Sequence, residues 1–305
     1  MLKRLQANFP LGEVANVNLF DDKGVLLLHK DQPITQGIRK HFKNLKLYVL
    51  QNQGNLNQTT SEKSKAFSEN IYINLVSSLW DIYHEAERIH PEKIKKTFMI
   101  VESIIKELQS NCIYFNFNAF RLVLEKHKQE SYSLFSHLLN VALLAAVTGM
   151  KLGYTGERLE NLILGACFHD IGKLKVPKEI INKPGKLTDE EFNVIKQHPI
   201  YGEKMLINAR LHSNVLAGVR EHHERWNGKG YPYGLNGNNI HMDAQIIAVA
   251  DVYDALTSDR PYRERLLPYQ ALEMIIDWTD KDFNPGVVQT FRESLILYPE
   301  NAIVP

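Results

Sequence analysis

Histidine and aspartate recur through the second half of the chain in a pattern that suits metal binding. A single histidine on a helix is usually a core or surface residue, and a single aspartate near a helix end is usually a cap, so only the joint pattern indicates a site. Nitrogen and oxygen donors without thiolate suit Fe, Mn, Ni, Co or Zn. The pattern consists of His137, His169-Asp170, His198, Glu221-His222-His223-Glu224, Asp251 and Asp254.

Two of the carboxylates come directly after apolar runs. His169-Asp170 follows the apolar residues 162–168, and Asp251 follows the apolar residues 246–250. A carboxylate at the edge of buried surface is costly unless it is paired or bound to a cation. We therefore expect both carboxylates to be satisfied by metal ions and by the neighbouring imidazoles.

The pattern holds more donors than one ion needs. A carboxylate has two oxygens, so Asp170 could bridge two ions. Two ions about 3.5–4 Å apart are the standard device for phosphoester hydrolysis, because they activate a water molecule and neutralise charge on the phosphate. A mononuclear site needs only His137, His169, Asp170 and Asp251, and the residues left for a second ion are His198, His222 and His223.

Basic and aromatic side chains accompany these candidate ligands. Lys173 lies one turn after His169 and is placed to contact a phosphate as a point charge. Residues 225–234 form a glycine-rich irregular loop, in which Tyr231 is predicted to stack on a substrate or hydrogen-bond to it. Arg260 and Arg263 follow the Asp251 helix and could grip a phosphate or read a guanine edge. In isolation, each feature would be a solvated side chain or a plain turn.

The composition limits the class of protein. The 305 residues carry 36 Lys and Arg against 35 Asp and Glu, a net charge of +1, which argues against binding to a DNA or RNA polymer. Two cysteines exclude a disulfide scaffold and indicate a reducing compartment, so we expect a cytoplasmic location. No apolar run approaches the roughly 20 residues of a membrane span.

The elements that position these residues are predicted to be mainly α-helical. We expect a small α+β N-terminal module over residues 1–55, with a hairpin at 14–28, a short helix at 35–42 and a strand at 45–50. A polar linker and connecting helices follow at 56–118, and an all-helical domain occupies 119–305. The helices are predicted at 67–88, 91–109, 133–151, 156–169, 189–207, 213–226, 243–257 and 269–278.

The motifs together resemble a known family. His169-Asp170 followed by Gly230-Tyr231-Pro232 is similar to the HD-GYP subgroup of the HD superfamily of metal-dependent phosphohydrolases. The resemblance extends over roughly residues 119–299, because further motifs match in order. These are residues 168–173, 196–199, 222–232, 248–251 and 260–263.

The resemblance implies an HD-type helical domain of bacterial origin that hydrolyses cyclic di-GMP to pGpG and then GMP. It implies two divalent ions per chain, iron or manganese. It also implies that Asp170 and Lys173 are catalytic, that Lys173 contacts the scissile phosphate, and that Arg260 and Arg263 contact the nucleotide. The implied metal ligands are His137, His169, Asp170, His198, His222, His223 and Asp251.

Two positions depart from the family pattern. Ser133 stands where some members hold a third metal with a carboxylate, so we expect two ions. Asn227 stands where the loop usually has Asp, and the lost charge is expected to weaken the support of the ligands. Two alternatives stay open: hydrolysis of another phosphoester, such as 3′,3′-cyclic GMP-AMP or a mononucleotide, and a catalytically weak module that binds cyclic di-GMP. The sequence leaves both a monomer and a homodimer open.

Overall fold

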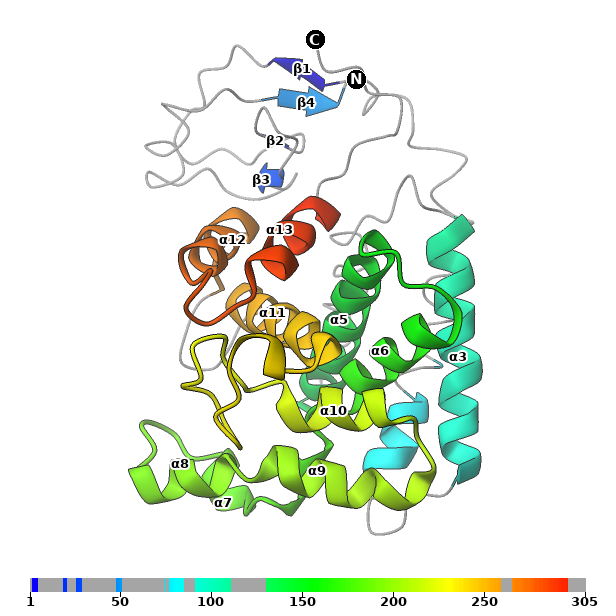
Figure 1. Ribbon diagram of the computed structural model, residues 1–305, viewed down its shortest axis with the longest axis vertical. Coiled ribbons are helices and arrows are strands. Elements are labelled where there is room, and N and C mark those ends of the chain that lie inside the picture. Colours follow the sequence, from blue (N-terminus) through cyan, green and yellow to red (C-terminus); the bar gives the residue numbers. More distant parts are fainter. Residues whose placement is uncertain are drawn as a thin grey trace.

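The computed structural model describes residues 2–4, 19–20, 26–28, 48–50, 74, 77–84, 91–110, 130–258 and 265–295 (Figure 1). These residues form a helical body with a small sheet at one end. The prediction of a mainly helical chain with a small β-containing part at its N-terminus is confirmed. The predicted helix at 35–42 and the polar linker after residue 50 lie outside the described residues.

The N-terminal strands form one antiparallel sheet. They are β1 (Leu2–Arg4), β2 (Leu19–Phe20), β3 (Leu26–Leu28) and β4 (Tyr48–Leu50), in the order β1-β4-β2-β3. The pairing of β2 with β3 confirms the predicted hairpin. The sheet lies beside α12 (Pro268–Asp277) and α13 (Pro285–Ser294), and β3 contacts α12 (Figure 1).

Four helices form the centre of the body. They are α5 (Glu130–Lys151), α6 (Gly156–Phe168), α10 (Ser213–Glu221) and α11 (Met242–Thr257), which pack on one another (Figure 1). In α5 and α11 apolar residues surround most of the helix, as is typical of central helices. The outer helices are α3 (Pro91–Ser110), α7 (Lys178–Ile181), α8 (Asp189–Ile195) and α9 (His198–Leu206), with α12 and α13, and the 3-10 turns are η1 (Ile171–Lys175), η2 (Ile207–Ala209) and η3 (Gly237–Asn239).

The helical residues 77–84 attach to the body through buried contacts. The Tyr83 hydroxyl donates to the backbone carbonyl of Cys167 at 3.3 Å, and Ser78 hydrogen-bonds Thr97 of α3 at 2.8 Å. Cys167 is a buried core residue, and burial raises the pKa of its thiol to about 12. Within the described residues, no helix combines the length and the apolar character that a membrane crossing requires.

The single helix predicted over 189–207 is wrong. The chain forms α8 and α9 instead, with Gln197 as the N-cap of α9 and a proline, Pro199, in its first turn. Proline has no N–H to continue the hydrogen-bond ladder of α8. The break leaves the Ile195 carbonyl within 2.8 Å of Nδ1 of His198, so it also orients a candidate ligand.

The helix predicted over 213–226 is too long, because α10 ends at Glu221. The amides of Trp226 and Asn227 donate to the carbonyls of Asp282 and Lys281, which draws the chain away from the helix axis. Helix α13 was not predicted, although its start carries a recognisable signal. Asn284 caps the amides of Gly286 and Val287, and proline occupies the first turn.

Candidate metal centre

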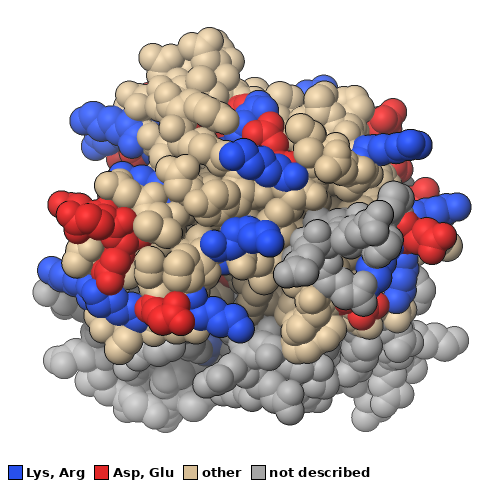
Figure 2. Space-filling view, turned by 90° about the horizontal axis from the view of Figure 1, so that it is seen from below, with Lys and Arg blue, Asp and Glu red and all other residues tan. Residues whose placement is uncertain are grey.

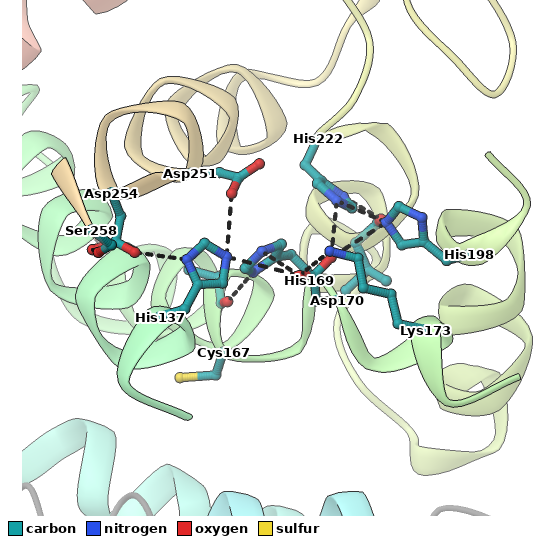
Figure 3. A network of polar contacts seen from close by, with 12 residues as sticks. His137, Cys167, His169, Asp170, Lys173, His198, His222, Asp251, Asp254 and Ser258 are labelled. Atoms are coloured by element: carbon teal, nitrogen blue, oxygen red, sulfur yellow. Dashed lines mark hydrogen bonds and ion pairs between the residues drawn. The ribbon is translucent and has the colours of Figure 1, made fainter. Parts of the chain in front are cut away.

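All seven predicted ligands converge between the central helices. Figure 3 labels all of them except His223. His137 comes from α5, His169-Asp170 directly follows α6, His198 begins α9, His222-His223 directly follows α10, and Asp251 lies in α11. Their donor atoms form two groups, and within each group they lie within 4.8 Å of one another. One group is Asp170, His198, His222 and His223, and the other is His137, His169 and Asp251.

The Asp170 carboxylate lies between these two groups. Its Oδ2 is 3.5 Å from Nε2 of His169 and 3.8 Å from Nε2 of His137. Its Oδ1 is 3.4 Å from Nε2 of His198 and 3.9 Å from Nε2 of His222. Each oxygen therefore faces a different group of imidazoles, which is the arrangement of a bridging carboxylate.

The histidine tautomers follow from contacts with the backbone. Nδ1 of His169, His198 and His222 lies 2.7, 2.8 and 2.8 Å from the carbonyl oxygen three residues earlier. A carbonyl only accepts, so Nδ1 carries the proton and Nε2 presents a lone pair. Metal-bound histidines are typically oriented by such a second hydrogen bond.

The Nε2 lone pairs face other acceptors, with no hydrogen-bond donor between them among the described residues. Nε2 of His198 and Nε2 of His222 are 3.3 Å apart. In the described part of the chain, Nε2 of His169 and Oδ1 of Asp170 are buried and have no hydrogen-bond partner. Buried acceptors that face one another are costly unless a cation lies among them. The residues therefore fit divalent cations on both sides of Asp170.

His137 is oriented by a carboxylate instead of a carbonyl. Its Nδ1 is 2.8 Å from Oδ2 of Asp254, whose Oδ1 accepts from Asn140 at 2.6 Å, and its Nε2 is 3.3 Å from Oδ1 of Asp251. Burial lowers the pKa of His137, but the bonds to Asp251 and Asp254 outweigh it and raise the pKa to about 10. A cation bound at Nε2 must displace this proton.

The other ionisable groups are held in the states that metal ligands require. Burial and the neighbouring imidazoles hold the pKa of His222 and His223 well below its ordinary value. Burial would raise the pKa of Asp170, but Lys173 and His169 hold it well below its usual range. Neutral imidazoles and ionised carboxylates are the forms that bind metal.

Lys173 lies at the open side of the centre. Its Nζ is 2.6 Å from Oδ2 of Asp170, and 37% of its side chain is exposed. Figure 3 shows the ammonium beside the carboxylate that separates the two groups. This position leaves the ammonium able to contact an anion that enters from solvent.

The loop after α10 is folded back onto the centre by Glu224. This buried carboxylate accepts from the amides of Tyr233 at 2.7 Å and Leu235 at 3.0 Å. A Cβ on Gly230 would overlap the backbone of residues 223–225, so glycine is required for this close approach. The Tyr231 ring consequently stacks on His223, with centroids 4.6 Å apart.

Asn227 makes one side-chain hydrogen bond within the loop and one to Asp282 outside it. Its Oδ1 accepts from the amide of Lys229 at 2.9 Å, and its Nδ2 donates to Asp282 at 3.4 Å. An amide supplies both a donor and an acceptor here, which a carboxylate does not. The expected weakening of the ligands by this departure stays a prediction. Arg260, Arg263 and the Ser133 side chain lie outside the described residues.

Two carboxylates of the sequence pattern, Asp254 and Glu224, organise the centre although neither was a predicted ligand. Asp254 was visible as an aspartate one turn after Asp251, and the helical spacing placed both on one face. Glu224 was visible beside the double histidine, but its partners are backbone amides nine and eleven residues later. Residue types alone do not reveal such partners.

Comparison with known proteins agrees with this geometry. A family model described as the HD domain matches residues 118–287. The chain is 37% identical over 188 residues to the cyclic di-GMP phosphodiesterase PA4108 of Pseudomonas aeruginosa, which covers 61% of this chain and 45% of that protein. It is 42% identical over 134 residues to 3′3′-cGAMP-specific phosphodiesterase 1 of Vibrio cholerae, covering 44% of this chain and 31% of that protein.

The chain spans less than half of the length of each of these two relatives. A solved structure, Bd1817, an HDG"Y"P protein from Bdellovibrio bacteriovorus, matches with a TM-score of 0.63 and 19% identity. That match covers 97% of this chain and 99% of the solved chain. It supports the fold of the described residues.

Proposed function

The chain belongs to the HD domain family, and from this premise we propose that it is a dinuclear metal-dependent phosphodiesterase that hydrolyses cyclic di-GMP to pGpG and GMP. The position of Asp170 carries this proposal, because its two oxygens face two separate groups of imidazoles. Support for the substrate comes from the name of the Pseudomonas aeruginosa relative. The sequence resemblance to the HD-GYP subgroup supports it further.

The proposed cofactors are two iron or manganese ions per chain. His137, His169 and Asp251 would hold one ion, His198, His222 and His223 would hold the other, and Asp170 would bridge them. When bound, such a pair lowers the pKa of a water molecule towards neutrality and polarises a phosphoryl oxygen. Every proposed donor is nitrogen or carboxylate oxygen, which both metals accept.

The protein's own residues would bind and orient the substrate. Lys173 is held beside Asp170 and would donate to a phosphate oxygen on which negative charge develops. Tyr231, fixed against His223, would contact the nucleotide, and Arg260 and Arg263 would bind its phosphate or a guanine edge. Burial holds the pKa of His222 and His223 well below its ordinary value, so these two imidazoles stay neutral and keep a lone pair for a cation.

The organisation of the chain is part of the same proposal. Residues 1–55 would form the N-terminal module, residues 56–118 the connection, and residues 119–305 the catalytic domain. A cytoplasmic location and a homodimer remain predictions.

A second candidate substrate is 3′,3′-cyclic GMP-AMP. The observation that favours it is the 42% identity to the Vibrio cholerae enzyme named for that substrate. Turnover of the two cyclic dinucleotides under identical conditions separates the candidates. A ratio of kcat/KM above about tenfold, equivalent to 1.4 kcal/mol, would assign the preferred substrate.

Anaerobic metal analysis coupled to chromatography of the products tests the proposed function. We expect about two ions per chain, with pGpG or GMP formed from cyclic di-GMP. Asp170→Ala provides the matched variant and is expected to lose the second ion and turnover, because it loses the bridge. Wild-type protein that holds two ions but hydrolyses no cyclic dinucleotide would contradict the proposal. Tight binding of cyclic di-GMP without turnover would instead indicate a signalling module.

A further inference from the structure

Phe192 is an exposed aromatic side chain next to the metal centre. It lies in α8, and 42% of its surface is exposed. Its ring meets Tyr231 edge-on, with centroids 6.3 Å apart. Tyr231 in turn stacks on the candidate ligand His223. A single ring therefore separates Phe192 from the ligands.

The helix that carries Phe192 is fixed at its beginning. Thr188 and Glu191 form a capping box, in which each side chain accepts from the other residue's amide. Lys183 adds an ion pair, with Nζ 2.7 Å from Oε2 of Glu191. The start of α8 is thus held by both backbone and side-chain contacts.

The end of α8 is tied to the metal centre. The carbonyl of Ile195 accepts from Nδ1 of His198 at 2.8 Å. Phe192 lies three residues before Ile195 in the same helix. Contacts at both ends hold α8 in place, and α8 therefore sets the distance from the Phe192 ring to the candidate ligands.

The surroundings of Phe192 offer charge as well as an apolar surface. The ammonium of Lys196 lies 4.7 Å from the centroid of the Phe192 ring and holds the ring from one side. Figure 2 looks onto the end of the molecule formed by α7, α8 and α9, where basic side chains are interspersed with acidic ones. This surface carries no uniform positive charge, so its affinity for a nucleotide must come from close contacts.

We propose that Phe192 is a base-stacking residue that receives one purine of the cyclic dinucleotide while a phosphate lies at the metal centre. This inference rests on the proposed function, since it requires a nucleotide substrate. Every nucleobase has a flat π-face that stacks on aromatic side chains. Phenylalanine has no hydrogen-bonding group, so Phe192 contributes affinity without selecting guanine over adenine.

Steady-state kinetics of the metal-replete full chain test this role. Stacking of one base is worth about 1–3 kcal/mol by alanine substitution, or roughly 5- to 150-fold in affinity. We expect Phe192→Ala to raise KM for cyclic di-GMP within this range and to leave kcat and metal content unchanged. The same variant should lose affinity for 3′,3′-cyclic GMP-AMP by a similar factor, and Phe192→Trp should retain wild-type KM.

Ile181→Ala is the matched control. Ile181 lies in the neighbouring helix α7 and is also 42% exposed, but no aromatic contact links it to Tyr231 among the described residues. This control should leave KM unchanged. A wild-type KM in Phe192→Ala, or an equal rise in Ile181→Ala, would overturn the stacking role alone.

Failure of the proposed function would give a different result. If wild-type protein with two ions shows no turnover, equilibrium binding of cyclic di-GMP to the same variants becomes the measurement. Weaker binding by Phe192→Ala than by Ile181→Ala would still support the stacking role. Equal binding by wild type and Phe192→Ala, or no binding by either, would overturn it.

Discussion

The buried imidazoles should make the stability of the metal-stripped chain depend steeply on pH. Burial lowers the pKa of His169, His222 and His223 in the folded protein. In the unfolded chain these groups titrate near 6.5, so the unfolded state binds more protons below that pH. The contribution of these three histidines to the free energy of unfolding is therefore complete above pH 6.5. It falls as the pH drops towards their pKa values in the folded protein.

The magnitude follows from the number of groups. Each histidine that gains a proton on unfolding contributes up to about 1.4 kcal/mol per pH unit. Three such groups give a slope that approaches about 4 kcal/mol per pH unit at roughly one unit below pH 6.5, where the unfolded imidazoles are almost fully protonated. His137 acts in the opposite sense, because its pKa is raised to about 10. Its contribution is full below pH 6.5 and is lost between 6.5 and 10, at no more than about 1.4 kcal/mol per unit.

Stability should accordingly be greatest near pH 6.5, with an acid limb about three times steeper than the alkaline limb. Urea unfolding of the metal-stripped full chain at half-unit intervals from pH 5 to 9 measures both limbs. His223→Gln should reduce the slope of the acid limb by about 1.4 kcal/mol per pH unit, the contribution of one proton. His84→Gln, at an exposed histidine in residues 77–84, is the control and should leave the slope unchanged. A wild-type acid limb with a slope of about 1.4 kcal/mol per pH unit or less, equivalent to one proton, would refute the reasoning.

Two further substitutions test the polar contacts of the centre. Asp254→Ala removes the carboxylate that orients His137 and should lower kcat/KM about 10- to 100-fold, the usual cost of losing such a partner. Asp243→Asn is the control, because it alters another buried aspartate of α11, and it should leave kcat/KM unchanged. Equal losses of kcat/KM in the two variants would contradict the orienting role of Asp254. Lys173→Met should lower kcat about 10²- to 10³-fold by analogy with the loss of one oxyanion donor, with both ions retained on metal analysis. An unchanged kcat would show that Lys173 does not contact the phosphate.

The ligands could be predicted because the types of the residues and their order along the chain identify the metal donors. Asp170 and Asp251 follow apolar runs, and burial of those runs forced both carboxylates to the edge of the core. The histidines then supplied partners for both carboxylates. The division into two groups could not be predicted, since it depends on which oxygen of Asp170 faces which ring.

The breaks in the helices were less predictable than the helices. Apolar spacing runs through residues 189–207, and Val215, Val219 and Trp226 share one helical face in residues 213–226, so periodicity favours continuous helices. Pro199 and the pairing of Trp226 with Asp282 end them. The first signal is local and was available in the sequence, whereas the second depends on a segment 56 residues away.

Both breaks serve the metal centre, which explains why local patterns failed there. Ending α8 at Ile195 frees a carbonyl to fix the tautomer of His198, and ending α10 at Glu221 directs two successive histidines inward. Gly172 completes the arrangement, because a Cβ at this position would overlap the carbonyl oxygen of His198. Only a residue without a side chain lets η1 approach α9 closely enough for Asp170 to reach both groups of imidazoles. The positions at which helical propensity is overridden are thus the positions that bring the two groups together.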